Sequence, residues 1–181
     1  MNSIYDTKEL NNGLRIPRLG FGVFRIDDSA KGRTALETAL ETGYRSFDTA
    51  AIYGNEATVG RVLEESEVPR EELFITTKVW NSDQGYRRCR DAFEKSREKL
   101  RTEEIDLYLI HWPVAETFAD TWRAMEELYA EGAVRAIGVC NFKSEHLEIL
   151  RSECSVVPAI NQVELHPYLI KEELRAYCRD H

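Results

Sequence analysis

The sequence predicts an α/β fold built on a (β/α)8 (TIM) barrel, with about six of the eight strand–helix units in 181 residues. Strand and helix patterns alternate with a period of roughly 30 residues, which requires right-handed parallel crossovers. A doubly wound sheet shares this alternation, but it opens with Gly-x-Gly-x-x-Gly after its first strand. The stretch from Gly20 to Arg25 lacks the third glycine, and no phosphate-loop motif occurs. The barrel is therefore favoured.

Polar residues provide the third observation, because they recur at or near the ends of five successive predicted strands. They are Asp48, Lys78, His111, Asn141 and Gln162, at intervals of 30, 33, 30 and 21 residues. Chemistry in a barrel of this class is carried at the carboxyl ends of the strands. The spacing therefore predicts a single site at one end of the barrel.

The chain opens with a predicted β-hairpin at Leu10–Ile16, because Asn12-Gly13 is a strong signal for a two-residue turn. Pro17 is expected to end it. Leu19–Phe24 is then expected to form the first strand of the barrel. An amphipathic helix follows and stops before Gly43, a residue typical of a helix C-terminus. Its apolar face is formed by Ala35, Leu36, Ala39 and Leu40.

The stretch from Tyr44 to Glu56 organises the predicted site. Its first four residues form a short strand, so Asp48 and Tyr53 are expected in the loop that follows it. The next helix begins at Glu56. A carboxylate and a phenol close together suit proton transfer if a cation holds the carboxylate and lowers the phenol's pKa from about 10. Lys78, at the end of the next predicted strand, is the expected cation.

The remaining elements repeat the pattern. Strands are predicted at Leu73–Val79, Ile105–Trp112, Val134–Phe142 and Ala159–Leu165. Helices are predicted at Glu56–Glu65, Tyr86–Leu100, Phe118–Tyr129, after Ser144 as the expected cap, and from about Leu174 onward. Trp122 and Met125 are expected in the core. No linker or shift in composition divides the chain, so residues 1–181 are expected to form one domain.

Composition limits the possible partners. The formal net charge is -8 and the pI is about 5.1, and no basic stripe offsets the acidic surface, so a nucleic-acid partner is not expected. No apolar stretch approaches the roughly 18 residues of a membrane span, and no signal peptide opens the chain. A cytoplasmic location follows by default.

The four cysteines lack Cys-x-x-Cys spacing and are expected to be reduced. No metal site is predicted, since His146 lacks His-Glu-x-x-His spacing; it is expected to face solvent, and His166 to be a loop residue with a structural hydrogen bond.

Five separate motifs, in order along nearly the whole chain, resemble those of the aldo-keto reductases, most closely the bacterial 2,5-diketo-D-gluconate-reductase-like branch. The motifs are Phe47-Asp-Thr-Ala-Ala-Ile-Tyr-Gly-Asn-Glu56, Thr77-Lys-Val-Trp80, Leu107-Tyr-Leu-Ile-His-Trp-Pro113, Ile137-Gly-Val-Cys-Asn-Phe142 and Asn161-Gln-Val-Glu-Leu-His-Pro-Tyr168. The resemblance implies a barrel that binds NADPH, or alternatively NADH, without a Rossmann domain. It also implies an oxidoreductase that reduces a small-molecule aldehyde or ketone to an alcohol.

Site residues follow from the same resemblance, position by position. The implied catalytic tetrad is Asp48, Tyr53, Lys78 and His111. The implied cofactor-binding residues are Gly22, Val23, Asp48, Cys140, Asn141 and Gln162. Tyr53 would act as the general acid, with its pKa lowered by Lys78, which Asp48 holds in place. His111 would orient the substrate oxygen, and Trp80 and Trp112 would form apolar substrate-binding walls. Considered singly, each residue is more simply an ordinary one: Asp48 a helix-cap or turn carboxylate, Lys78 a surface lysine and His111 a core histidine. Their shared placement reverses this preference and favours the site.

Two departures from the family pattern bear on these expectations. Cys140 stands where the family has serine, and a thiol is the weaker hydrogen-bond donor. Exposed and partly ionised, Cys140 would also make the site sensitive to oxidation. The second departure is length, because two barrel strands are missing. The full-length form is expected to be a monomer, whereas a truncated barrel is expected to self-associate through its open edges. Two alternatives stay open: a cofactor-sensing regulatory subunit with the same barrel, and an inactive fragment of the reductase.

Overall fold

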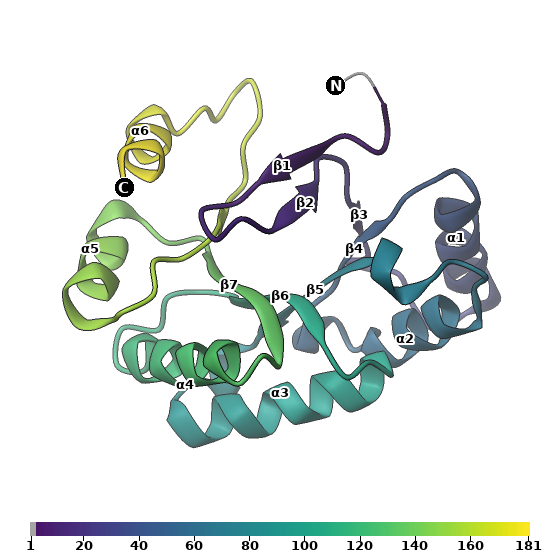
Figure 1. The fold of residues 1–181 in the computed structure, drawn as a ribbon, viewed down its shortest axis with the longest axis horizontal. Coiled ribbons are helices and arrows are strands. Elements are labelled where there is room, and N and C mark those ends of the chain that lie inside the picture. The colour runs from purple at the N-terminus through teal and green to yellow at the C-terminus, as the bar shows by residue number, and fades with distance from the viewer. Residues whose placement is uncertain (1–2) are drawn as a thin grey trace.

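The computed structural model describes residues 3–181, which form one curved parallel sheet with helices on its outer face and a hairpin across its inner face (Figure 1). The sheet has the order β3-β4-β5-β6-β7-β8, and every neighbouring pair is parallel. Its strands are β3 (Phe21–Gly22), β4 (Ser46–Asp48), β5 (Phe74–Val79), β6 (Ile105–Ile110), β7 (Val134–Cys140) and β8 (Asn161–Gln162).

Six α-helices alternate with these strands, as the 30-residue period predicts. They are α1 (Ala30–Glu41), α2 (Glu56–Glu65), α3 (Tyr86–Leu100), α4 (Phe118–Ala130), α5 (Ser144–Glu153) and α6 (Glu172–Asp180). Short 3-10 turns occur at η1 (Ala51–Tyr53), η2 (Arg70–Glu72) and η3 (Asn81–Asp83). The hairpin pairs β1 (Thr7–Glu9) with β2 (Arg15–Pro17) in antiparallel register. Within residues 3–181, no helix has the length and apolar character needed to cross a membrane.

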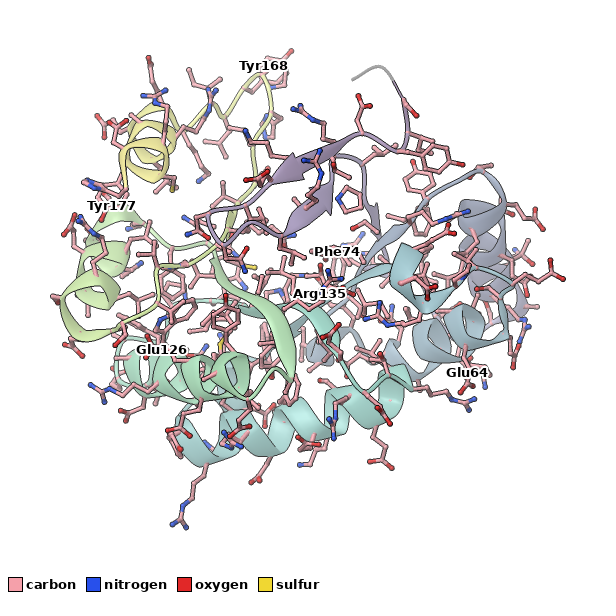
Figure 2. The ribbon with its side chains drawn as sticks, viewed as in Figure 1. Glu64, Phe74, Glu126, Arg135, Tyr168 and Tyr177 are labelled. Atoms are coloured by element: carbon pink, nitrogen blue, oxygen red, sulfur yellow. The ribbon has the colours of Figure 1, made fainter. Side chains whose placement is uncertain are left out.

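Side chains of the sheet alternate between two cores. The larger core lies between the outer face and the helices and contains the buried residues Trp122 and Met125, as expected. The smaller core lies on the inner face; Phe74, at the centre of the molecule in Figure 2, belongs to it. Apolar residues of the hairpin, including Leu14 and Ile16, pack against this inner cluster. The hairpin therefore closes one end of the curved sheet.

The curvature of the sheet brings distant strands into contact. Gln162 of β8 donates a hydrogen bond from Nε2 to Oδ2 of Asp48 in β4, over 2.8 Å, although three strands separate them in the sheet. A flat sheet holds neighbouring strands nearly 5 Å apart, so such a contact requires a barrel-like bend. Strands β3 and β8 are the two edges of the described sheet. The fold is thus an incomplete (β/α)8 barrel with six strands and an N-terminal β-hairpin, as predicted.

Three local expectations were wrong. Asp48 is the last residue of β4 and does not lie in the loop after it. Ser144 is the first residue of α5, and the cap position belongs to Lys143. The Lys143 N–H is satisfied by Nδ1 of His146 at 3.1 Å, and the His146 ring packs edge-on against Phe118 and Phe142. His146 is therefore a half-buried capping residue and not a solvent-facing one.

Asp106 anchors the end of the barrel opposite the predicted site. It is fully buried near the start of β6 and accepts hydrogen bonds from the Ile75 N–H at 2.8 Å and from Arg70 and Arg135, each at 2.7 Å. Three donors compensate for the removal of this carboxylate from water. Arg135 is labelled next to Phe74, near the centre of the molecule, in Figure 2. Interactions at this end of a barrel, away from the carboxyl ends of the strands, serve stability.

Candidate active site

Lys78 and Asp48 form the buried centre of the candidate site. Lys78 lies in β5, is 1% exposed, and its ammonium pairs with Oδ1 of Asp48 at the end of β4. The same ammonium donates to the Thr49 carbonyl at 2.8 Å, while Gln162 occupies the other Asp48 oxygen. A lysine at this depth keeps its charge only where such partners replace water. The structure therefore fixes a cation below the open end of the barrel.

Tyr53 ends the 3-10 turn η1, which follows β4, and its ring lies over this cation. The Lys78 Nζ is 5.4 Å from the centroid of the ring. The pKa of Tyr53 is nevertheless raised, first by burial and then by the negative charge of Asp48. The expectation that Lys78 lowers this pKa was wrong for the free protein. The physical reason is that burial removes the phenolate from water, and that the Asp48 carboxylate adds a negative charge near the phenol.

His111 faces Tyr53 from the end of β6. The two rings meet edge-on with centroids 5.7 Å apart, and Trp80 packs on His111 in the same way at 5.2 Å. Burial and the positive charge of Lys78 lower the pKa of His111 to about 4. The imidazole is therefore neutral at neutral pH. Its Nδ1 is buried and has no hydrogen-bond partner among residues 3–181.

Asn141 and Gln162 lie beside this group on neighbouring strands. Asn141 follows β7 in a left-handed conformation (φ 61°), which asparagine tolerates better than most residues. Its Nδ2 donates to the His111 carbonyl at 3.1 Å, and its N–H donates to the Gln162 carbonyl at 3.0 Å. The structure thus brings together the five predicted strand-end residues and Tyr53 at this end of the barrel.

Cys140 differs from the expectation of an oxidisable thiol. It is 2% exposed, and burial raises its pKa to about 12, so the reactive thiolate is suppressed. Its Sγ contacts Oε1 of Gln162 at 3.5 Å, as a weak donor does. Cys140 therefore contributes packing and one weak hydrogen bond, and its sensitivity to oxidation is not supported.

An open cleft of about 870 Å³ adjoins the site. The residues that line it include Gly22, Val23, Asp48, Tyr53 and Gln162. A Cβ atom at Gly22 would meet nothing within 4 Å, so this glycine leaves free space on the cleft wall. Gly22, Val23, Asp48 and Gln162 were four of the residues expected to bind a cofactor. Apolar side chains such as Val23 and polar ones such as Asp48 and Gln162 border the same space, which is the mixed lining typical of a small-molecule site.

Aromatic residues form the rim. Trp80 is half-buried against His111, whereas Trp112 is 47% exposed. Phe24, which sequence reasoning did not single out, is 62% exposed and its ring lies 4.9 Å from that of Tyr53. Gln84 is fully buried and donates to the Trp112 carbonyl at 2.7 Å, which fixes the backbone of the rim. The position of Phe24 directly after Gly22-Val23 is the one signal in the sequence for its role.

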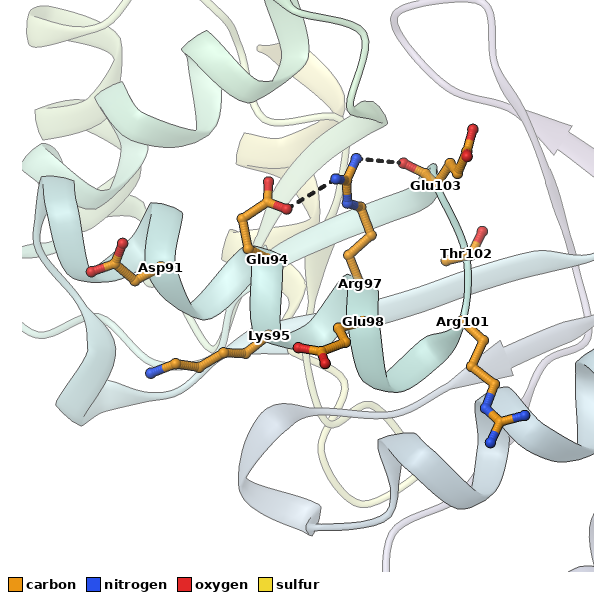
Figure 3. Close-up of a pocket in the computed structure, with 8 residues that line it drawn as sticks. All are labelled: Asp91, Glu94, Lys95, Arg97, Glu98, Arg101, Thr102 and Glu103. Atoms are coloured by element: carbon orange, nitrogen blue, oxygen red, sulfur yellow. Dashed lines mark hydrogen bonds and ion pairs between the residues drawn. The ribbon is translucent and has the colours of Figure 1, made fainter.

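A groove of about 690 Å³ at the end of α3 is unrelated to this site (Figure 3). None of its lining residues belongs to the predicted site, and they come from α3 and the loop before β6. Arg97 pairs with Glu94 at 3.0 Å and donates to the Glu103 carbonyl at 3.1 Å (Figure 3). Such exposed pairs are typical of a solvated helix surface.

The sequence and structure of the chain were compared with those of known proteins. The model of the aldo/keto reductase family matches residues 18–181. The chain belongs to the aldo/keto reductase family. It is 54% identical over all of its 181 residues to a 9,11-endoperoxide prostaglandin H2 reductase of Trypanosoma cruzi. A glyoxal reductase of Bacillus subtilis is 52% identical over 98% of the chain. In both cases the aldo/keto reductase chain described here spans 64% of the relative's length, less than two thirds.

A solved structure agrees with this assignment. An aldo-keto reductase of Bombyx mori in complex with NADP superposes on 98% of the chain with a TM-score of 0.91 and 35% sequence identity. The matched part is 64% of that protein. The six-stranded parallel sheet of this aldo/keto reductase chain is thus the corresponding part of a known barrel.

Proposed function

We propose that the protein is an oxidoreductase that reduces small aldehydes or ketones to alcohols with NADPH, and that Tyr53 is its general acid. The observation that carries the proposal is the buried ion pair of Lys78 with Asp48 beneath Tyr53, with His111 facing the same phenol. The name of one relative, a glyoxal reductase, supports a carbonyl substrate, since glyoxal is a dialdehyde.

The residues proposed to hold the cofactor border the cleft beside Asp48. Gly22, Val23, Asp48 and Gln162 line it directly, and Cys140 and Asn141, which both contact Gln162, complete the proposed set. NADH is the alternative to NADPH. The Bombyx mori relative, solved with NADP, supports the choice of a nicotinamide cofactor. When bound, NADPH supplies the hydride that adds to the carbonyl carbon.

Proton delivery is assigned to Tyr53. Its raised pKa keeps the phenol protonated at neutral pH, so the acid is present in the form that a reduction requires. As the proton moves to the substrate oxygen, negative charge develops on the phenol. The Lys78 ammonium, held by Asp48 and the Thr49 carbonyl, is already in place to stabilise that charge.

His111 is proposed to orient the substrate. With a pKa of about 4 it is neutral at working pH, and a neutral imidazole donates one hydrogen bond to the carbonyl oxygen without supplying the proton itself. Trp80 and Trp112 are proposed as apolar walls that exclude water and favour bulky or aromatic carbonyl compounds.

The wider setting of the protein is also a proposal. We propose that residues 1–181 act as a single domain, that the protein works in the cytoplasm, and that its full-length form is a monomer. The acidic net charge of -8 supports the absence of a nucleic-acid partner. Its partners are then the cofactor and a small-molecule carbonyl substrate.

Substitution of Tyr53 tests the proposed chemistry. Tyr53→Phe removes only the hydroxyl, so kcat for aldehyde reduction should fall at least about 100-fold while the Kd for NADPH changes little. Lys78→Met should behave in the same way. Tyr86→Phe is a matched control, since its hydroxyl bonds Glu127 on the surface and should leave kcat unchanged.

Three results would count against the assignments. A Tyr53→Phe enzyme with more than about a tenth of the wild-type kcat would remove Tyr53 as the acid. An unchanged substrate profile in His111→Gln would remove the orienting role of His111. NADPH binding without turnover of any aldehyde in a broad panel would favour the cofactor-sensing alternative.

A further inference from the structure

Asn55 is a buried polar residue next to the candidate site for which the proposed chemistry has no use. It lies at the cap position before α2 and is 3% exposed. Asparagine at this position normally accepts a hydrogen bond from the first turn of its own helix. The Asn55 side chain makes no such bond. Its amide therefore serves some other part of the structure.

Three hydrogen bonds show where the amide group is directed. Oδ1 accepts from the Thr49 hydroxyl at 2.7 Å, and Nδ2 donates to the carbonyls of Val23 and Ile26, each at 2.8 Å. Both amide hydrogens and the carbonyl oxygen are thus used at ideal lengths. One side chain joins the loop after β4 to the loop after β3.

Each of these loops carries a part of the proposed machinery. The Thr49 carbonyl accepts from the Lys78 ammonium at 2.8 Å. In the other loop, the Val23 N–H donates to the Asp48 carbonyl at 3.0 Å, and the next residue, Phe24, packs on the Tyr53 ring. A shift of either loop would therefore move the cation, or the aromatic support of the phenol.

We propose that Asn55 is a positioning residue for carbonyl reduction, which sets the relative placement of the Lys78 ammonium and the Tyr53 phenol through Thr49 and the Val23–Ile26 loop. It touches neither substrate nor cofactor. The inference rests on the proposed function, because it assigns a role in that reaction. Misplacement of reacting groups by about 1 Å typically lowers the rate on the order of 100-fold, so removal of a side chain that holds two loops together is expected to lower kcat.

A purely structural role is the competing explanation, and Thr58 provides the matched comparison. Thr58 is in the same helix, is also 3% exposed, and donates to Asp28 at 2.8 Å in the same β3–α1 connection. Its bond reaches neither Thr49 nor Val23. Thr58→Ala should therefore cost stability without displacing the cation, whereas Asn55→Ala should do both.

The kinetic test compares these variants. Asn55→Ala should lower kcat about 10- to 100-fold, with KM for NADPH within about twofold of the wild type. Thr58→Ala should keep kcat within about twofold. Thr49→Val removes only the hydroxyl that reaches Asn55 and should lower kcat in the same direction by a smaller factor; it also serves if Asn55→Ala does not fold. Equal kcat losses in the Asn55 and Thr58 variants would overturn the proposal.

A second readout does not depend on turnover. The Lys78 charge helps to lower the pKa of His111, so the His111 titration, followed by NMR in a chain with only four histidines, reports where the ammonium lies. Asn55→Ala should raise that pKa by about half a unit or more, because the ammonium moves away, and Thr58→Ala should leave it unchanged. If the wild type reduces no carbonyl, the proposed function fails, and this shift still shows that Asn55 sets the place of the Lys78 ammonium. An unchanged His111 titration in both Asn55→Ala and Thr49→Val overturns it.

Discussion

Acid should destabilise the protein through His111, by an amount that follows from its burial. The residue is 8% exposed, and its pKa falls from the ordinary 6.5 to about 4 in the folded state. The unfolded chain therefore takes up the proton first, and stability is lost as the pH falls from about 6.5 toward 4. At about 1.4 kcal/mol per unit, the free energy of unfolding should decrease by at most about 3 kcal/mol from this group alone.

Urea unfolding of the wild type and of His111→Gln, at intervals between about pH 7 and 4, measures this contribution. Glutamine takes up no proton, so the wild type should lose up to about 3 kcal/mol more than the variant. Carboxylates with a lowered pKa, such as those of Asp27 and Asp28, titrate in both proteins and cancel in the difference. A His166→Gln control retains His111 and should keep the wild-type slope. Parallel curves for the wild type and His111→Gln would refute the reasoning.

Two further predictions concern packing. Asp106→Asn should lower the free energy of unfolding in urea by about 3–5 kcal/mol, because the buried carboxylate holds the Ile75 N–H and two arginines. The control Asp120→Asn breaks an exposed pair and should cost at most about 1 kcal/mol. Equal losses in the two variants would contradict this account. Gly60→Ala should lower the free energy of unfolding, measured by thermal denaturation, by about 1–3 kcal/mol. The reason is that its Cβ would lie 2.5 Å from the Lys99 carbonyl oxygen. An unchanged Tm would contradict this, because it would show that α2 and α3 can move apart without loss.

The elements with a clear period were predictable from the sequence. The α2 and α3 helices have the predicted bounds, because apolar residues at three- and four-residue intervals mark a face that must be covered. Strand β5 was found as a run of apolar and β-branched residues and β6 as a strand of the buried type, and every residue in them is buried. Such runs do not say which side chains face the barrel interior. The inward orientation of Lys78 could therefore be inferred only from the chemical role expected of it, and not from the hydrophobic pattern of the strand.

The candidate site was predictable as a set of strand-end residues, but its electrostatics were not. A sequence places Lys78 near Tyr53, yet the pKa of the phenol depends first on its burial and then on its distance from the Asp48 carboxylate, and the sequence gives neither. The sequence alone also does not show the burial that suppresses ionisation of the Cys140 thiol. Asn55 follows Gly54, and such a pair usually marks a turn, so the sequence gives no sign of the buried hydrogen bonds that Asn55 makes.

The contacts of the hairpin with the far end of the chain bear on the order of folding during synthesis. The Asn11 Nδ2 donates to the carbonyls of Val157 and Pro158, residues 146 and 147 positions later. At a synthesis rate of roughly 5–20 residues per second, the hairpin waits on the order of 10–30 seconds for these partners. During that time its apolar face, with Leu14 and Ile16, has no inner core to cover. The hairpin is thus synthesised well before the residues that it packs against, and chaperone binding would act on it in that interval.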